Sequence, residues 1–179
     1  MLAWALSRWL GISLDERLRL TPGAVGVGVV AAVPLLLGLR WIVTTRLSPF
    51  RRLVSLVVEQ LGPLLASRSA TEVALLATLA GLAEEILFRG VVQPGLTSVL
   101  PSGVALVVTS VVFGLAHFVT PVYALLAGAA GLYLGALILL QGNLLVPIVA
   151  HAVYDFVALL YLVQRYRGRT DGPADRGTA

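Results

Sequence analysis

The chain has 179 residues, of which 58% are hydrophobic and only 12% are charged, and its formal net charge is +4. Soluble domains are about 25% charged, so this composition excludes an ordinary soluble domain and indicates an integral membrane protein of one domain. The absence of cysteine excludes disulfides and thiolate metal sites. The arginines stand at the ends of apolar segments, where lipid headgroups attract them, so the positive charge does not indicate a nucleic-acid partner.

The first 20 residues predict an interfacial amphipathic segment. Arg8 interrupts the initial apolar run too early for a secretory signal peptide. Trp9 suits the headgroup level of a membrane. Ser13 and Glu16 have the spacing of a capping box, which predicts a short helix after Ser13.

Five long apolar segments follow, at residues 22–45, 70–98, 103–119, 121–141 and 144–163. Each is long enough, or nearly so, to cross about 30 Å of hydrocarbon at about 1.5 Å per residue. Thr21, Ser69 and Thr120 precede three of them as expected N-caps. Residues 51–67 are shorter and contain Glu59, so we expect them to lie on the membrane, with a sixth span as the alternative. The predicted fold is an all-α polytopic bundle of about five transmembrane helices.

The arginines predict the orientation of this bundle, because basic residues favour the cytoplasmic side. They surround the first connection and fill the C-terminal tail, so with five spans both face the cytoplasm of a prokaryotic cell. The exclusive use of arginine over lysine points to a GC-rich prokaryotic genome. The predicted organisation is an interfacial segment (1–20), a first transmembrane helix with a cytoplasmic interfacial segment (21–69), a core (70–163) and a disordered cytoplasmic tail (164–179).

The core holds few ionisable side chains. Between Val73 and Val163 the charged residues and the chain's two histidines are Glu84, Glu85, Arg89, His117, His151 and Asp155. A charged group at the centre of a membrane helix costs about 2.5–3.5 kcal/mol on the milder scales. Keeping six ionisable groups in one apolar region therefore indicates a function, and their types indicate acid–base or metal chemistry.

Two adjacent glutamates stand on the second predicted span. Glu85 and Arg89 are four residues apart, which predicts a buried salt bridge on one helix face. Glu84 lies about 100° around the helix and has no local partner, so it must face other helices or water. The two carboxylates are therefore expected to have different roles.

The two histidines stand on other spans. His117 ends the sequence FGLAH, and His151 and Asp155 begin and end HAVYD, where their spacing puts them on one helix face. Taken singly, each is explained as a hydrogen-bonded core histidine or an interhelical polar clamp. Taken together with Glu84, they indicate a hydrolytic site on three spans.

The residue types suit peptide hydrolysis. A glutamate in an apolar site is a stronger base than in water and can deprotonate a bound water molecule. Imidazoles or a bound cation can stabilise the tetrahedral oxyanion. No serine or threonine has comparable neighbours, which disfavours a nucleophilic triad.

Three motifs in this order, EEILFR, FGLAH and HAVYD, resemble the CAAX-protease and bacteriocin-processing family, also called CPBP or Abi. The resemblance covers about residues 70–163 and implies an all-helical intramembrane endopeptidase that acts on a membrane-associated protein or peptide. By position it implies that Glu84 is the general base, that His117 helps to bind the water or a metal, and that His151 and Asp155 complete the site and stabilise the oxyanion. The ion pair Glu85–Arg89 would orient the helix.

The resemblance also implies one divalent metal ion, zinc above all, held by His117 and His151, while a metal-free mechanism driven by the glutamate stays open. Two histidines and one carboxylate match the ligands of a catalytic zinc ion. If Glu84 were that carboxylate, it would have to act both as a zinc ligand and as the general base. The family's third motif more often ends in asparagine, where this chain has Asp155. The chain is also short, so a groove for a lipid tail is not inferred and neither is a prenylated substrate.

Two other functions stay open: a non-proteolytic bacteriocin-immunity or partner-binding membrane protein, and a small proton-coupled carrier. The absence of an inverted repeat counts against the carrier. Gly131 and Gly135 have the G-x-x-x-G spacing of close helix packing. His117 is near the end of its span, so Glu84 reaches its depth only if the second span tilts strongly or begins outside the hydrocarbon.

Overall fold

The computed structural model describes residues 7–170, and every regular element in that part of the chain is helical. The elements are α2 (Leu14–Arg17), α3 (Pro22–Thr44), α4 (Ser48–Leu65), α5 (Ala70–Glu85), the π-helical segment η1 (Ile86–Val92), α6 (Gln93–Thr97), α7 (Ser102–Ala116), α8 (Pro121–Gln141) and α9 (Leu145–Thr170).

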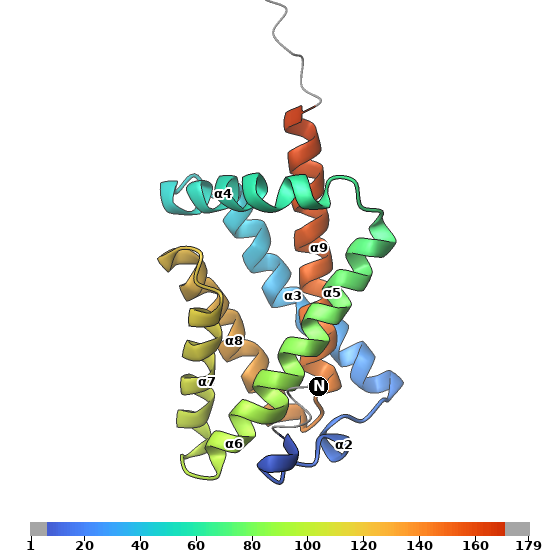
Figure 1. The fold of residues 1–179 in the computed structure, drawn as a ribbon, viewed down its shortest axis with the longest axis vertical. Helices are drawn as coiled ribbons and strands as arrows, with labels where there is room; N and C mark the ends of the chain where they lie inside the picture. The colour runs from blue at the N-terminus through green and yellow to red at the C-terminus, as the bar shows by residue number, and fades with distance from the viewer. Residues whose placement is uncertain (1–6, 171–179) are drawn as a thin grey trace, which may run out of the picture.

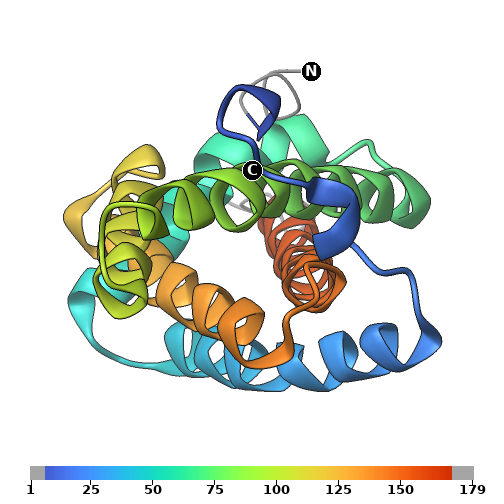
Figure 2. The same ribbon diagram turned by 90° about the horizontal axis from the view of Figure 1, so that it is seen from below.

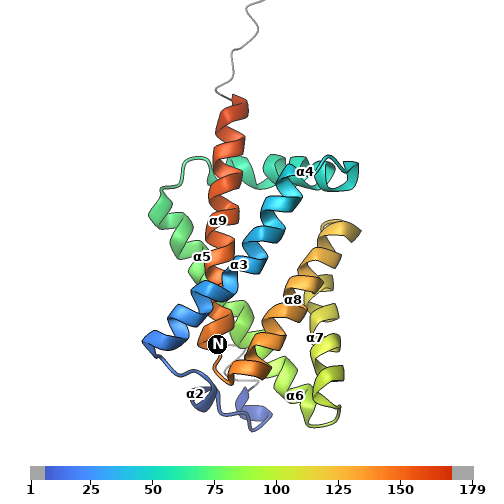
Figure 3. The ribbon, with the colours of Figure 1, turned by 180° about the vertical axis from the view of Figure 1, so that it is seen from behind.

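The helices form a bundle with one helix across its end. Figure 1 shows α3, α5, α7, α8 and α9 running between the two ends of the molecule, whereas α4 lies across one end. Seen from below, α9 lies between α3 and α5 and contacts both (Figure 2). Helices α7 and α8 pack against each other as a hairpin beside them (Figure 3).

This architecture confirms the prediction of an all-α membrane protein. Helices α3, α8 and α9 are long and apolar enough to cross a membrane, and α7 is a shorter apolar helix. The predicted second span is divided into α5, η1 and α6, which follow one path across the bundle (Figure 1). The segment predicted to lie on the membrane is α4, and its course across the bundle end fits that prediction.

Local capping signals placed three helix starts correctly. The hydroxyl groups of Thr21 and Thr120 accept hydrogen bonds from backbone N–H groups of the first turns of α3 and α8. Ser69 is the N-cap of α5, as expected, and it forms a capping box with Glu72. The short helix that the spacing of Ser13 and Glu16 indicates is present as α2, which begins after Ser13, although the Ser13 side chain makes no capping hydrogen bond. There α2 is only one turn long, and it is anchored by the buried side chain of Leu14.

The end of α9 corrects one predicted boundary. The helix continues to Thr170, so residues 164–170 are helical although the predicted disordered tail begins at 164. The guanidinium group of Arg167 donates two hydrogen bonds to the carbonyl oxygen of Ala66, at 3.1 and 2.6 Å. These bonds to the end of α4 hold the last turns of α9 in place. Residues 171–179, and the first six residues of the predicted N-terminal segment, lie outside the described residues.

Candidate active site

The helix that carries both glutamates changes its geometry at the site. After Glu85 the backbone passes into η1, and the N–H of Gln93 bonds to the carbonyl oxygen of Phe88, five residues back. In an α-helix, residues four apart drift by about 40° around the axis, and the wider π turn offsets this drift. The side chains of Glu85, Arg89 and Gln93 therefore follow one face, and they are 0%, 1% and 2% exposed.

Glu85 and Arg89 form the buried ion pair that the sequence predicts. Arg89 Nη1 lies 2.8 Å from Glu85 Oε1, and both side chains are fully buried. Arg89 Nη2 donates a second hydrogen bond, 2.8 Å long, to the carbonyl oxygen of Gly131 in α8. The guanidinium carbon also lies 4.5 Å from the centroid of the Phe113 ring in α7. Arg89 thus joins the continuous helical stretch of α5, η1 and α6, which we call the glutamate helix, to α7 and α8.

One turn further along, Gln93 repeats this contact. Its Nε2 donates to the carbonyl oxygen of Gly135 at 3.2 Å. A Cβ atom at Gly131 would lie 3.2 Å from Arg89 Nη2, and one at Gly135 would lie 2.8 Å from Gln93 Oε1. The predicted close-packing glycines therefore admit two polar side chains, one at each carbonyl.

The two imidazoles are oriented by acceptors on their Nδ1 atoms. His117 Nδ1 lies 2.8 Å from the carbonyl oxygen of Phe113, and His151 Nδ1 lies 2.9 Å from Glu85 Oε1. A carbonyl or carboxylate oxygen only accepts, so these partners assign the hydrogen to Nδ1 in each ring. In a neutral ring the lone pair is then on Nε2, which faces the centre of the site.

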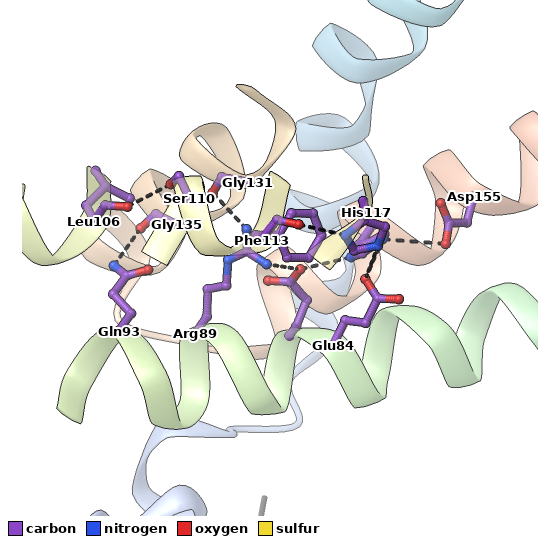
Figure 4. A network of polar contacts seen from close by, with 12 residues as sticks. Glu84, Arg89, Gln93, Leu106, Ser110, Phe113, His117, Gly131, Gly135 and Asp155 are labelled. Atoms are coloured by element: carbon purple, nitrogen blue, oxygen red, sulfur yellow. Dashed lines mark hydrogen bonds and ion pairs between the residues drawn. The ribbon is translucent and has the colours of Figure 1, made fainter. Parts of the chain in front are cut away.

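Glu84 lies where the two Nε2 atoms converge (Figure 4). Its Oε2 is 3.3 Å from His117 Nε2 and 3.9 Å from His151 Nε2. His151 Nε2 is also 3.5 Å from Asp155 Oδ2. Oε2 of Glu84 is buried and has no hydrogen-bond partner, and such an atom indicates a position for water or another ligand.

The site reaches the outside on one side. The side chains of Glu84, His117 and Asp155 are 30%, 26% and 24% exposed, whereas those of Glu85 and Arg89 are fully buried. The expected strong tilt of the second span is also present, because α5 crosses the bundle diagonally (Figure 1). This tilt brings Glu84 to the depth of His117, which caps the end of α7.

A family comparison decides what this arrangement belongs to. The family model described as "Type II CAAX prenyl endopeptidase Rce1-like" matches residues 66–157. The chain belongs to this family. The match spans α5 to the first half of α9 and includes all six ionisable residues of the core. Searches of curated proteins and of solved structures found no match.

The family membership confirms the resemblance inferred from the three motifs. The protein is therefore a CAAX-type membrane protease with helices for a lipid bilayer, and a membrane-associated substrate follows from that class. The structure brings together all six residues singled out in the sequence. Their individual catalytic roles stay predictions.

Sequence reasoning assigned no role to two residues of this candidate site. Gln93 carries a signal in retrospect, because it continues the four-residue spacing of Glu85 and Arg89 as a polar residue in an apolar run. Phe113 packs its ring against that of His117, with centroids 4.4 Å apart. Its signal in the sequence is its place at the start of the FGLAH motif, four residues before His117.

The donor set fits a divalent cation in type. Each imidazole donates its Nδ1 hydrogen to a carbonyl or carboxylate, as metal-binding histidines do, and presents Nε2 beside the carboxylates of Glu84 and Asp155. Within residues 7–170, however, no group of three or more His, Asp and Glu side chains is arranged to hold a metal ion. The donors are adjacent, but they do not form a preformed metal site.

Proposed function

We propose that this protein is an intramembrane endopeptidase in which Glu84 activates the water that hydrolyses a peptide bond. One observation carries the proposal: two imidazole Nε2 atoms converge on an unpartnered carboxylate oxygen of Glu84. Glu84 is the partly exposed member of the glutamate pair, with a side chain that is 30% exposed, although its Oε2 is itself buried beside the two imidazoles. Glu85 is fully buried and already bonded to Arg89 and His151, which leaves it a positioning role.

The steps follow from these positions. Glu84 takes a proton from the water molecule as its oxygen attacks the carbonyl carbon of the substrate. His117 and His151, when protonated at Nε2, donate to the resulting oxyanion, and Asp155 holds the imidazolium of His151. Glu84 then gives its proton to the amide nitrogen as the carbon–nitrogen bond breaks. The products are a new carboxylate and a new amine.

Charge balance allows two forms of this proposal. Three carboxylates and one guanidinium give the site a formal charge of −2 when both imidazoles are neutral. Either two protons on the imidazoles or one divalent cation neutralise this charge. In the second form His117 and His151 would hold the ion with Glu84 or Asp155, and zinc suits such nitrogen and oxygen donors. A bound zinc ion would make a coordinated water more acidic and polarise the substrate carbonyl. Metal analysis of the wild type beside the His117→Ala variant separates the two forms.

The proposed substrate is a peptide segment of a membrane-associated protein, cleaved in a prokaryotic cell membrane. The site lies where the glutamate helix meets His117 at the end of α7 and Asp155 in the first half of α9 (Figure 4), within the bundle that α4 crosses at one end (Figure 1). Because that end carries most of the arginines, we place it and the C-terminus in the cytoplasm. No prenyl group is assigned to the substrate.

The test is the Glu84→Gln substitution in purified protein. The probes are fluorogenic peptides ending in a CAAX sequence, with and without a farnesyl group on the cysteine. We expect cleavage to fall at least about 100-fold, because the amide cannot accept the proton of the water. Glu59→Gln is the matched control, since Glu59 is exposed on α4 and outside the site. If the Glu84→Gln protein still cleaves the peptides, Glu84 is not the general base. An unchanged biological effect of that variant would favour an immunity or binding protein.

A further inference from the structure

The end of α3 and the start of α4 form a packed corner at one end of the molecule (Figure 3). The ring of Trp41 in α3 lies edge-on against that of Phe50 in α4, with centroids 5.0 Å apart at an interplanar angle of 72°. The hydroxyl of Thr44 donates to the carbonyl oxygen of Arg40 at 2.7 Å and so closes the last turn of α3. We call residues 40–52 the arginine corner.

The arginine corner holds four positive charges that no Asp or Glu among residues 7–170 pairs with. Its exposed arginines are Arg40, Arg46, Arg51 and Arg52. The chain has no Asp or Glu between Glu16 and Glu59. Within the described residues, Glu59 lies against Arg169 instead, and Glu72 against Arg68. The four charges must therefore be balanced from outside the described part of the chain.

Apolar side chains accompany these arginines. Trp41 is 52% exposed and Leu47 is 54% exposed, although both belong to the corner. Helix α4 buries Leu53, Val58 and Gly62, and it contacts α9 with its inner side. An exposed tryptophan among arginines, at the end of an apolar span, is typical of the headgroup level of a membrane.

We propose that the arginine corner binds the phosphate headgroups of anionic phospholipids in the leaflet beside α4. A guanidinium group matches a phosphate with two parallel hydrogen bonds, which suits this ligand better than a diffuse surface charge does. Trp41 and Leu47 lie against the upper part of the acyl chains while the arginines hold the phosphates. The proposal concerns a lipid site that is independent of the proposed peptidase chemistry.

The test compares lipid binding by the purified full-length protein in neutral detergent. Bound lipids are counted by native mass spectrometry during titration with phosphatidylglycerol, with phosphatidylcholine as the zwitterionic reference. We expect phosphatidylglycerol to bind more tightly, and the variants Arg51→Gln and Arg52→Gln to weaken its binding about fivefold or more each. Arg68→Gln is the matched control, because it removes the same charge from the same end but from an arginine paired with Glu72. It should change the affinity less than about twofold.

Two further arms complete the experiment. Arg46→Gln, in the connection between the two helices, gives an independent reading if either helix variant folds poorly. Inorganic phosphate at equal concentration should not displace the lipid, because it lacks acyl chains. Equal binding of the two lipids, equal loss in the Arg68→Gln control, full binding by all three corner variants or displacement by inorganic phosphate would each overturn the proposal.

Discussion

Glu85 is the residue around which the site is organised. A single oxygen, Oε1, lies 2.8 Å from Arg89 Nη1 and 2.9 Å from His151 Nδ1. This oxygen neutralises the arginine and sets which ring nitrogen of His151 faces Glu84. The sequence pattern predicted only the pairing with Arg89, because that pairing is local to one helix. The bond to His151 depends on how α9 packs, and no sequence spacing reports it.

The two adjacent glutamates should differ in what they do for stability. We expect Glu85→Gln to destabilise the protein by about 3–5 kcal/mol, because it leaves the charge of Arg89 buried without its counter-charge. Glu84→Gln should have little effect on stability, since Glu84 is partly exposed and its Oε2 has no hydrogen-bond partner. Thermal unfolding of both variants in detergent measures the difference. A lower midpoint for Glu84→Gln than for Glu85→Gln would contradict this assignment.

At the scale of elements, the contact between the glutamate helix and α8 depends on two glycines. At Gly135 an added Cβ would overlap Leu106 Cδ1 and would lie 2.8 Å from Gln93 Oε1. We expect Gly135→Ala to cost about 1–3 kcal/mol and to lower cleavage, because the added methyl group displaces the ends of the Leu106 and Gln93 side chains and disturbs the contact of Gln93 with α8. Gly26→Ala is the control, since nothing lies within 4 Å of a Cβ at that position in α3. Thermal unfolding and peptide cleavage test both variants, and equal effects would refute the role of this contact.

The same elements show what a sequence can predict here. Thr21, Ser69 and Thr120 placed helix starts because a cap acts within one turn. The π-helical geometry of η1 was not predicted, because no periodicity of the sequence in this segment indicates it. It occurs where Arg89 and Gln93 pack against α8, and this packing is a tertiary contact. The three motifs predicted which residues meet. They did not predict that the two Nε2 atoms would be the ones that face Glu84.

At the scale of the whole molecule, the distribution of arginines predicts how the bundle is inserted. The end crossed by α4 carries Arg51, Arg68 and Arg167 among others, and the opposite end carries Arg17 and Arg19 beside acidic residues. Basic residues near span ends favour the cytoplasmic side, so the α4 end should face the cytoplasm. The partly exposed side chains Glu84, His117 and Asp155 would then lie within a bundle whose α4 end faces the cytoplasm.

The chain offers a direct test of this orientation because it contains no cysteine. Ser67 is exposed in the connection after α4, and Ser98 is exposed at the opposite end, after α6. We expect a membrane-impermeant maleimide to label Ser98→Cys in intact spheroplasts and to label Ser67→Cys only after permeabilisation. Both substitutions are small and lie outside the site, so cleavage activity serves as the control for folding. Labelling of Ser67→Cys in intact spheroplasts would invert the orientation, and the arginine corner would then face the outer leaflet.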